Sequence, residues 1–325
     1  MFEELRIKVI EEYPFLENSN LDIVKKFEMS DGRASSTYLA NSDKEGFKKF
    51  VIKTFNQYSK AKEKNDELIK EYIILKMLNG KNIAAPKVLG THEPKKYLLM
   101  SFVEGENAAL VAKDDKKSAI IFEKVGEEIG KLHTVDMDAF GNITQIKTSD
   151  WKEFQTNKFN MNAENIKEVV DKDIFDKATK RFYGYEYLLE DEAKGKPVLL
   201  PHDLHLDNFL YDEENKTATY IDYGIALAGR PFFDLAKLYI WTFNDYPDQV
   251  GNFLKGYKKY IDIPNDFNQR MEMYILRECF GMINFFRIME DKKELKNTID
   301  FLKDYLNGAS HIQKLNCSNL AMRIS

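Results

Sequence analysis

The chain has 325 residues, of which 43% are hydrophobic and 31% are charged, and its net charge at pH 7 is −5. This length permits a sizeable core and about two domains, and the 23 Phe and 17 Tyr favour a packed fold over disorder. No long basic run is present to neutralise phosphates, no apolar stretch reaches roughly 18 residues, and the two Cys form neither a disulfide framework nor a zinc site. The N-terminus has the pattern of neither a signal peptide nor a transit peptide. We therefore expect a cytoplasmic protein with no nucleic-acid partner, no membrane span and no obligate protein partner.

The front of the chain alternates between strand and helix patterns. Residues 1–13 predict a helix, residues 21–55 predict strands around the polar turns SDGRAS and NSDKEG, and residues 61–79 return to helical spacing. Two further strands are expected at 83–91 and 96–105.

The rest of the chain is mainly helical. We expect helices, in chain order, over 116–135, 160–190, 231–260 and 267–307. Residues 198–223 interrupt them with the short strand-like runs VLL, FLY and ATYID. The sequence thus predicts a strand-rich part and a helix-rich part, and a cleft between two such parts is a usual place for a ligand.

The candidate chemistry lies in PHDLHLDNFLYDEENKTATYIDYG, residues 201–224. Asp203 precedes Asn208 by five residues, and Asp222 follows fourteen residues later. In phosphoryl transfer a protein supplies a base near the attacking hydroxyl and oxygen ligands for Mg²⁺. The kinase catalytic loop has this Asp-to-Asn spacing and is followed by a D-F-G segment, which reads D-Y-G here. The pattern predicts Asp203 as the catalytic base and Asn208 and Asp222 as Mg²⁺ ligands.

Other interpretations of these residues are weaker. Asp203 taken alone would suit a turn. His202 and His205 form H-x-x-H without the glutamate of H-E-x-x-H and without an evident third zinc ligand. We expect His205 to brace the loop, His133 to be structural, and Asp234 to cap a helix and stabilise the loop.

The stretch resembles the aminoglycoside phosphotransferase and choline kinase superfamily, relatives of the protein kinases that act on small molecules. The family pattern His-Gly-Asp-Leu-His-x-x-Asn corresponds to PHDLHLDN (201–208), with Pro201 and His202 in place of the family His and Gly. The family segment Gly-x-Pro-x-x-Asp-Leu-Ala resembles AGRPFFDLAKL (228–238). The resemblance implies a bilobal, protein-kinase-like α+β fold with a small antiparallel-sheet lobe over 1–102 and a larger, mainly helical lobe over 103–325. It also implies ATP (or GTP) and Mg²⁺ as cofactors.

The resemblance extends to the nucleotide site. In VIKTF (51–55), Lys53 stands where the family keeps the strand lysine that pairs with phosphates and with a helix glutamate. Glu71 is the expected partner, and Glu67, one turn earlier, competes with it. The strand and hinge YLLMSFVEG (97–105) then implies that backbone groups of Met100 to Phe102 bond the purine edge.

The phosphate loop departs most from the family. SDGRASS (30–36) has one glycine and not the G-x-G-x-x-G of protein kinases. A turn at Gly32 can still present backbone N–H groups to phosphates, with Ser35 or Ser36 adding hydroxyl donors.

The function implied is a kinase that phosphorylates a hydroxyl of a small molecule, with an aminoglycoside as first candidate and choline, ethanolamine or a sugar as alternatives. A protein kinase is a second hypothesis, but no A-P-E segment follows Asp222 and only the eight residues 224–231 separate Tyr223 from the next helix. A catalytically silent nucleotide-binding scaffold is the third. It is disfavoured because every polar catalytic position is filled.

Overall fold

The computed structural model describes residues 2–27, 35–55, 64–90, 93–144 and 147–308. By its internal packing the chain divides into two compact units, Met1–Leu110 with Asp207–Ala226, and Val111–Leu206 with Leu227–Ser325. No helix among the described residues is both long enough and apolar enough to cross a membrane.

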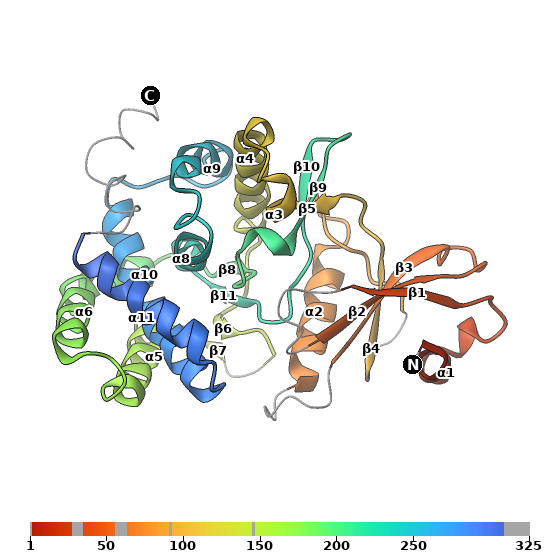
Figure 1. Cartoon of the computed structure of the whole chain (residues 1–325), viewed down its shortest axis with the longest axis horizontal. Helices are drawn as coiled ribbons and strands as arrows, with labels where there is room; N and C mark the ends of the chain where they lie inside the picture. Colours follow the sequence, from red (N-terminus) through yellow and green to blue (C-terminus); the bar gives the residue numbers. More distant parts are fainter. Residues whose placement is uncertain (1, 28–34, 56–63, 91–92, 145–146, 309–325) are drawn as a thin grey trace. The chain divides into compact units, whose positions relative to one another are not determined.

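The first unit is built on a four-stranded antiparallel sheet in the order β1-β2-β3-β4 (Figure 1). Its elements are α1 (Phe2–Glu12), the 3₁₀ turn η1 (Pro14–Leu16), β1 (Asp22–Phe27), β2 (Ser35–Asn41), β3 (Lys49–Phe55), α2 (Lys64–Leu78) and β4 (Tyr97–Ser101). Alternate residues of β2 are buried, as a half-buried strand requires. The buried side chains pack against α1 in a core that includes Val9, Tyr38, Phe50 and Leu99. Helix α2 contacts β3 and β4.

A smaller sheet of the first unit joins two segments that are far apart in the sequence. It contains β5 (Glu106–Asn107), β9 (Phe209–Asp212) and β10 (Thr217–Tyr220) in the order β10-β9-β5. Gly105 enters it with φ +138°, and a Cβ there would lie 2.9 Å from the carbonyl oxygen of Tyr211, so only glycine fits. By its packing the first unit includes residues 103–110 and 207–226, which the division expected from the sequence had assigned to the helical part.

The second unit is mainly helical. Its helices are α4 (Asp115–Leu132), α5 (Trp151–Ile166), α6 (Lys172–Gly184), α7 (Glu186–Glu192), α8 (Pro231–Trp241), η3 (Pro247–Gln249), α9 (Val250–Tyr257), α10 (Phe267–Ile288) and α11 (Lys292–Leu306); the short helices α3 (Ala108–Val111) and η2 (Leu206–Asn208) lie where the two units meet in sequence. A small antiparallel sheet, in the order β7-β6-β11-β8, contains β6 (Phe140–Asn142), β7 (Lys147–Thr148), β8 (Val198–Leu200) and β11 (Leu227–Gly229).

Helices α4 and α9 pack at very short range. A Cβ on Gly126 would lie 2.1 Å from the carbonyl oxygen of Phe253, and one on Gly256 would lie 1.9 Å from that of Glu123. The missing side chains let the backbones of the two helices lie against one another (Figure 1).

The structure differs from the sequence predictions of secondary structure in several segments. The strand expected at 83–91 is only an isolated bridge from Val88 to Met100 in its described part, because Pro86 has no N–H to continue a ladder. The helix expected over 160–190 is three helices, because the Asp171 side chain accepts hydrogen bonds from the amides of Asp173 and Ile174 and starts α6 anew. In the same way Pro247 starts η3 inside the segment 231–260.

A buried carboxylate on α4 gives a pH-dependent prediction for stability. Glu128 is 1% exposed, and its Oε1 has no hydrogen-bond partner among the described residues. Its Oε2 lies 3.7 Å from Lys131 Nζ. Burial raises the pKa of Glu128 to about 8. Because the folded pKa is above the unfolded one, stability from this group is fully present at acid pH and falls as pH rises toward 8, by up to about 1.4 kcal/mol per pH unit. We expect Glu128→Gln to gain stability over the wild type between pH 5 and pH 8 in urea unfolding.

The neighbouring Glu127 is the matched control. In spite of its burial, the ammonium groups of Lys259 and Lys124 lower the pKa of Glu127. Glu127→Gln should therefore be less stable than the wild type, the opposite sign, and because the stabilisation by Glu127 is complete above its unfolded pKa, this difference should stay constant from pH 5 to pH 8. Equal pH profiles for the two variants would contradict this account of Glu128.

Candidate active site

The first unit brings together three of the predicted site residues. Lys53 Nζ donates to Glu71 Oε2 at 2.7 Å and lies 3.1 Å from Asp222 Oδ1. Lys53 lies in β3 and Glu71 in α2, and both are buried, at 5% and 0% exposure. Glu71, the first choice of the sequence pattern over Glu67, is thus the glutamate that this ammonium bonds.

Carboxylates outnumber ammonium groups in this cluster, because Lys53 faces both Glu71 and Asp222. Burial disfavours the charged form of Lys53, but the carboxylates of Asp222 and Glu71 outweigh it and raise the pKa of Lys53. Burial raises the pKa of Glu71, and the Lys53 ammonium holds that rise back. Glu71 Oε1 has no hydrogen-bond partner in the described part of the chain. Lys53 therefore stays cationic in a site whose negative charge is partly uncompensated.

The β9–β10 hairpin places the two predicted metal ligands at one end. Phe209 pairs with Tyr220 at the last register position, and the next backbone bond runs from the Ile221 amide to the Asn208 carbonyl at 3.1 Å. Asn208, just before β9, and Asp222, just after β10, therefore lie at the same end of the hairpin.

The donors in this hairpin fit Mg²⁺ in kind. Asp222 Oδ1 accepts from the Gly224 amide at 3.1 Å, the Asp222 side chain is 25% exposed, and Asn208 is buried. No group of three or more His, Cys, Asp or Glu in the described ranges has the arrangement of a metal site. The oxygens of Asp222 and Asn208 are of the kind that Mg²⁺ takes when it has one or two protein ligands and completes its shell with phosphate oxygens and water.

In the second unit Asp203 faces two basic side chains. His205 Nε2 lies 3.6 Å from Asp203 Oδ2, and Lys237 Nζ lies 3.8 Å from Asp203 Oδ1. Burial alone would raise the pKa of Asp203, but His205 and Lys237 outweigh it and hold the pKa well below its usual range. Asp203 is thus ionised at neutral pH and partly exposed, with 38% of its side chain accessible.

The residue before Asp203 has an unusual backbone. His202 has φ +62°, in the left-handed region that favours glycine. The family pattern has Gly at this position, so the departure noted in the sequence falls where the chain turns left-handed. The His202 ring stacks on Phe233 at a centroid distance of 5.0 Å, and its Nδ1 lies 3.8 Å from Asp234 Oδ1.

Asp234 is completely buried and anchors a chain of polar groups. His133 Nε2 lies 3.1 Å from Asp234 Oδ2, and His133 Nδ1 lies 2.8 Å from the Tyr257 hydroxyl. Burial would raise the pKa of Asp234, but His133 and His202 lower it. Asp234 thus contacts both the end of α4 and the residue before Asp203.

The other predicted nucleotide residues are scattered along the sheet. Ser35 and Ser36 begin β2, where Ser36 pairs with Thr54 beside Lys53, and Gly32 lies outside the described residues. Met100 is paired on both sides, with Val51 in β3 and with Val88. Phe102 follows the end of β4, and Lys49 Nζ lies 3.7 Å from the centre of its ring.

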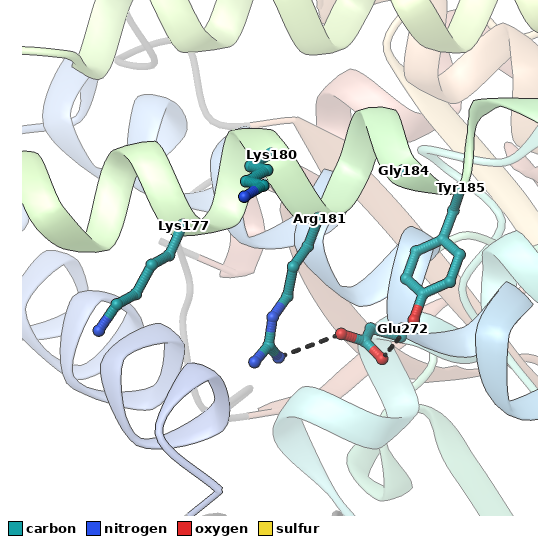
Figure 2. A pocket seen from close by; sticks show the side chains of 6 residues that line it. All are labelled: Lys177, Lys180, Arg181, Gly184, Tyr185 and Glu272. Carbon is teal, nitrogen blue, oxygen red and sulfur yellow. Dashed lines mark hydrogen bonds and ion pairs between the residues drawn. The ribbon is translucent and has the colours of Figure 1, made fainter.

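A cavity of about 690 Å³ in the second unit holds none of the predicted residues. It lies between α6 and α10 and is lined by Lys177, Lys180, Arg181, Gly184, Tyr185 and Glu272. Figure 2 shows Arg181 and Tyr185 reaching Glu272, with Arg181 Nη1 at 3.2 Å from Oε1 and the Tyr185 hydroxyl at 3.0 Å from Oε2. Both oxygens of this carboxylate thus accept hydrogen bonds from other residues of the cavity lining.

Sequence reasoning missed Lys237. Its Nζ donates to the carbonyl oxygen of His202 at 2.7 Å, directly beside Asp203. The signal was present, because Lys237 is the one basic residue in the apolar run PFFDLAKLYIW (231–241). A cation on a largely buried helix needs a partner.

Comparisons with known proteins identify the family and the fold of this chain. A family model described as the phosphotransferase enzyme family (APH) matches residues 28–268. The solved structure of aminoglycoside phosphotransferase APH(4)-Ia is similar at 12% identity and a TM-score of 0.67, over 95% of this chain and 100% of that one. The GDP and kanamycin complex of APH(2")-IIia is similar at 16% identity and a TM-score of 0.65, over 94% and 99%. A ternary complex of a thermostable APH(4)-Ia mutant with AMP-PNP and hygromycin B is similar at 13% identity and a TM-score of 0.66, over 92% and 98%. No curated protein sequence matches this chain. The kinase-like α+β fold predicted from the sequence is confirmed.

Proposed function

The chain belongs to the phosphotransferase enzyme family and is a small-molecule phosphotransferase, and we propose that it moves the γ-phosphoryl group of ATP or GTP to a hydroxyl of a small acceptor. The observation that carries this proposal is the buried Lys53–Glu71–Asp222 cluster, formed by a strand lysine, a helix glutamate and the aspartate of the D-Y-G segment. A solitary structural ion pair would not need the second carboxylate.

We assign the donor side of the reaction to the first unit. Lys53, oriented by Glu71, steadies the donor phosphates, while Asn208 and Asp222 would hold Mg²⁺. The metal, when bound, neutralises charge on the phosphate oxygens. Ser35 and Ser36 remain candidates for hydroxyl donors. Phe102, which follows the end of β4, is a better candidate for the purine edge than Met100, which is paired on both sides.

Asp203 is the proposed catalytic base. Its lowered pKa keeps it ionised, so that it accepts a hydrogen bond from the acceptor hydroxyl and orients that oxygen. A base of low proton affinity suffices, because the transition state of phosphoryl transfer is loose and positioning dominates.

We place the enzyme in the cytoplasm, with the nucleotide bound by the sheet-containing lobe and the acceptor by the helical lobe. The similar APH(4)-Ia and APH(2")-IIia structures contain AMP-PNP or GDP beside hygromycin B or kanamycin, which makes an aminoglycoside the first acceptor to test. Choline, ethanolamine and sugars are the next.

A coupled ADP-release or GDP-release screen tests the proposal. We expect Mg²⁺-dependent nucleotide turnover that rises with one class among aminoglycosides, amino-alcohols, sugars and nucleosides. Labelled nucleotide with generic protein substrates is the counter-screen, and phosphate incorporated only into protein would contradict a small-molecule acceptor. Absence of Mg²⁺-dependent nucleotide binding in a thermal-shift assay would instead favour a silent scaffold.

A further inference from the structure

Helix α8 holds the residue before Asp203 through three different contacts. Phe233 stacks on the His202 ring, Asp234 faces the His202 Nδ1 atom at 3.8 Å, and Lys237 Nζ donates to the His202 carbonyl oxygen at 2.7 Å. The three partners lie in the first two turns of α8, so a single helix contacts both the ring and the backbone of His202.

The backbone contact acts directly on Asp203. The carbonyl that Lys237 bonds belongs to the peptide group that joins His202 to Asp203. Because the peptide group is planar and its plane contains the Asp203 Cα, a hydrogen bond that holds its oxygen also holds the position of that Cα. The left-handed His202, at φ +62°, costs conformational energy that these contacts offset.

Charge adds a second link between the same residues. Lys237 Nζ lies 3.8 Å from Asp203 Oδ1, and the Lys237 side chain is only 15% exposed. The other titratable groups near Asp203 are His205 at 3.6 Å and His202, whose ring faces the buried carboxylate of Asp234 and, through it, His133. Lys237 therefore faces Asp203 directly through its ammonium group as well as through the His202 carbonyl.

We propose that Lys237 is a positioning residue for phosphoryl transfer, which fixes the His202–Asp203 peptide and so directs the Asp203 carboxylate toward the acceptor hydroxyl. This inference rests on the proposed role of Asp203 as the base. His202 contributes by anchoring the same peptide to α8 from its other side.

Lys237→Met tests the proposal in two independent measurements. Turnover should fall on the order of 10²-fold, the size expected when a reacting group is misplaced by about 1 Å, with the nucleotide KM unchanged. The pKa of Asp203, followed by ¹³C NMR of aspartate carboxyl groups and assigned with Asp203→Asn, should rise, and the acid limb of the turnover profile should move to higher pH with it. Lys237→Arg, which keeps the charge, should restore most of the turnover and the wild-type titration.

Lys124→Met is the matched control, because it removes one lysine and its ion pair with Glu127 in the same unit. It should change neither the turnover profile nor the Asp203 titration. If Lys237→Met does not fold, Lys237→Gln, which can still donate to a carbonyl, allows the same titration to be measured.

The outcomes separate this inference from the proposed function. An Asp203 titration that is the same in the wild type and in the neutral Lys237 variants overturns the role of Lys237. Wild-type protein without Mg²⁺-dependent nucleotide turnover overturns the proposed function, and the titration still decides whether Lys237 controls Asp203. A loss of turnover that is due wholly to a higher nucleotide KM also contradicts a positioning role.

Discussion

Replacing Asp203 with asparagine is expected to lower turnover on the order of 10²–10⁴-fold, the usual contribution of a positioned general base. Asparagine keeps the size of the side chain and removes the charge that Lys237 and His205 stabilise. The acceptor hydroxyl then loses its strongest hydrogen-bond acceptor, while the residues proposed to bind the nucleotide are unchanged. The loss should therefore appear in kcat, with nucleotide affinity within about twofold of the wild type, since chemistry and ground-state binding are separable.

Asp248→Asn is the control for this prediction. Asp248 is an exposed carboxylate in η3 of the same unit, and the change alters net charge by the same amount. It should leave kcat unchanged. Near-normal turnover of Asp203→Asn with the acceptor found in the screen would remove Asp203 from the role of base.

The fold was predictable where local pattern and burial agree. Strand β2 alternates between buried and half-buried residues, and the long buried stripe of α4 follows helical spacing, so both could be identified from the sequence. The pairing of β5 with β9 was not visible, because it joins segments about 100 residues apart and strands of two to four residues leave no periodic trace.

Some residues of the candidate site could be identified from the sequence, and others could not. Lys53, Glu71 and Asp222 were identified by spacing and resemblance, and the structure brings their side chains together. The left-handed backbone of His202 was not predicted, because only its position in the family pattern, and no property of histidine, indicates φ +62°. Lys237 was missed because its partner is a backbone carbonyl 35 residues earlier, which no side-chain motif records.

Removing the buried ammonium of Lys53 should affect stability and activity together. Lys53→Met leaves the fully buried Glu71 and the neighbouring Asp222 without their cation. Breaking a buried ion pair by removing one partner costs about 3–5 kcal/mol of unfolding free energy, and turnover should fall to background because the donor phosphates lose their charge partner. In this variant the pKa of Glu71 rises further above its unfolded value. The stability loss is therefore smaller at pH 5 and grows as pH rises toward 8.

The double variant Lys53→Met/Glu71→Met distinguishes the structural from the catalytic role of this pair. Replacing both members of a buried ion pair by apolar side chains of similar volume is often neutral for stability, so urea unfolding should recover most of the loss seen in the single variant, and its dependence on pH should weaken. Turnover should stay at background, because the apolar pair cannot bind phosphate. A double variant that recovered turnover along with stability would mean that Lys53 holds the fold and takes no part in the chemistry. A single variant as stable as the wild type would mean that Glu71 is neutral in the native protein, because a protonated carboxyl needs no cation.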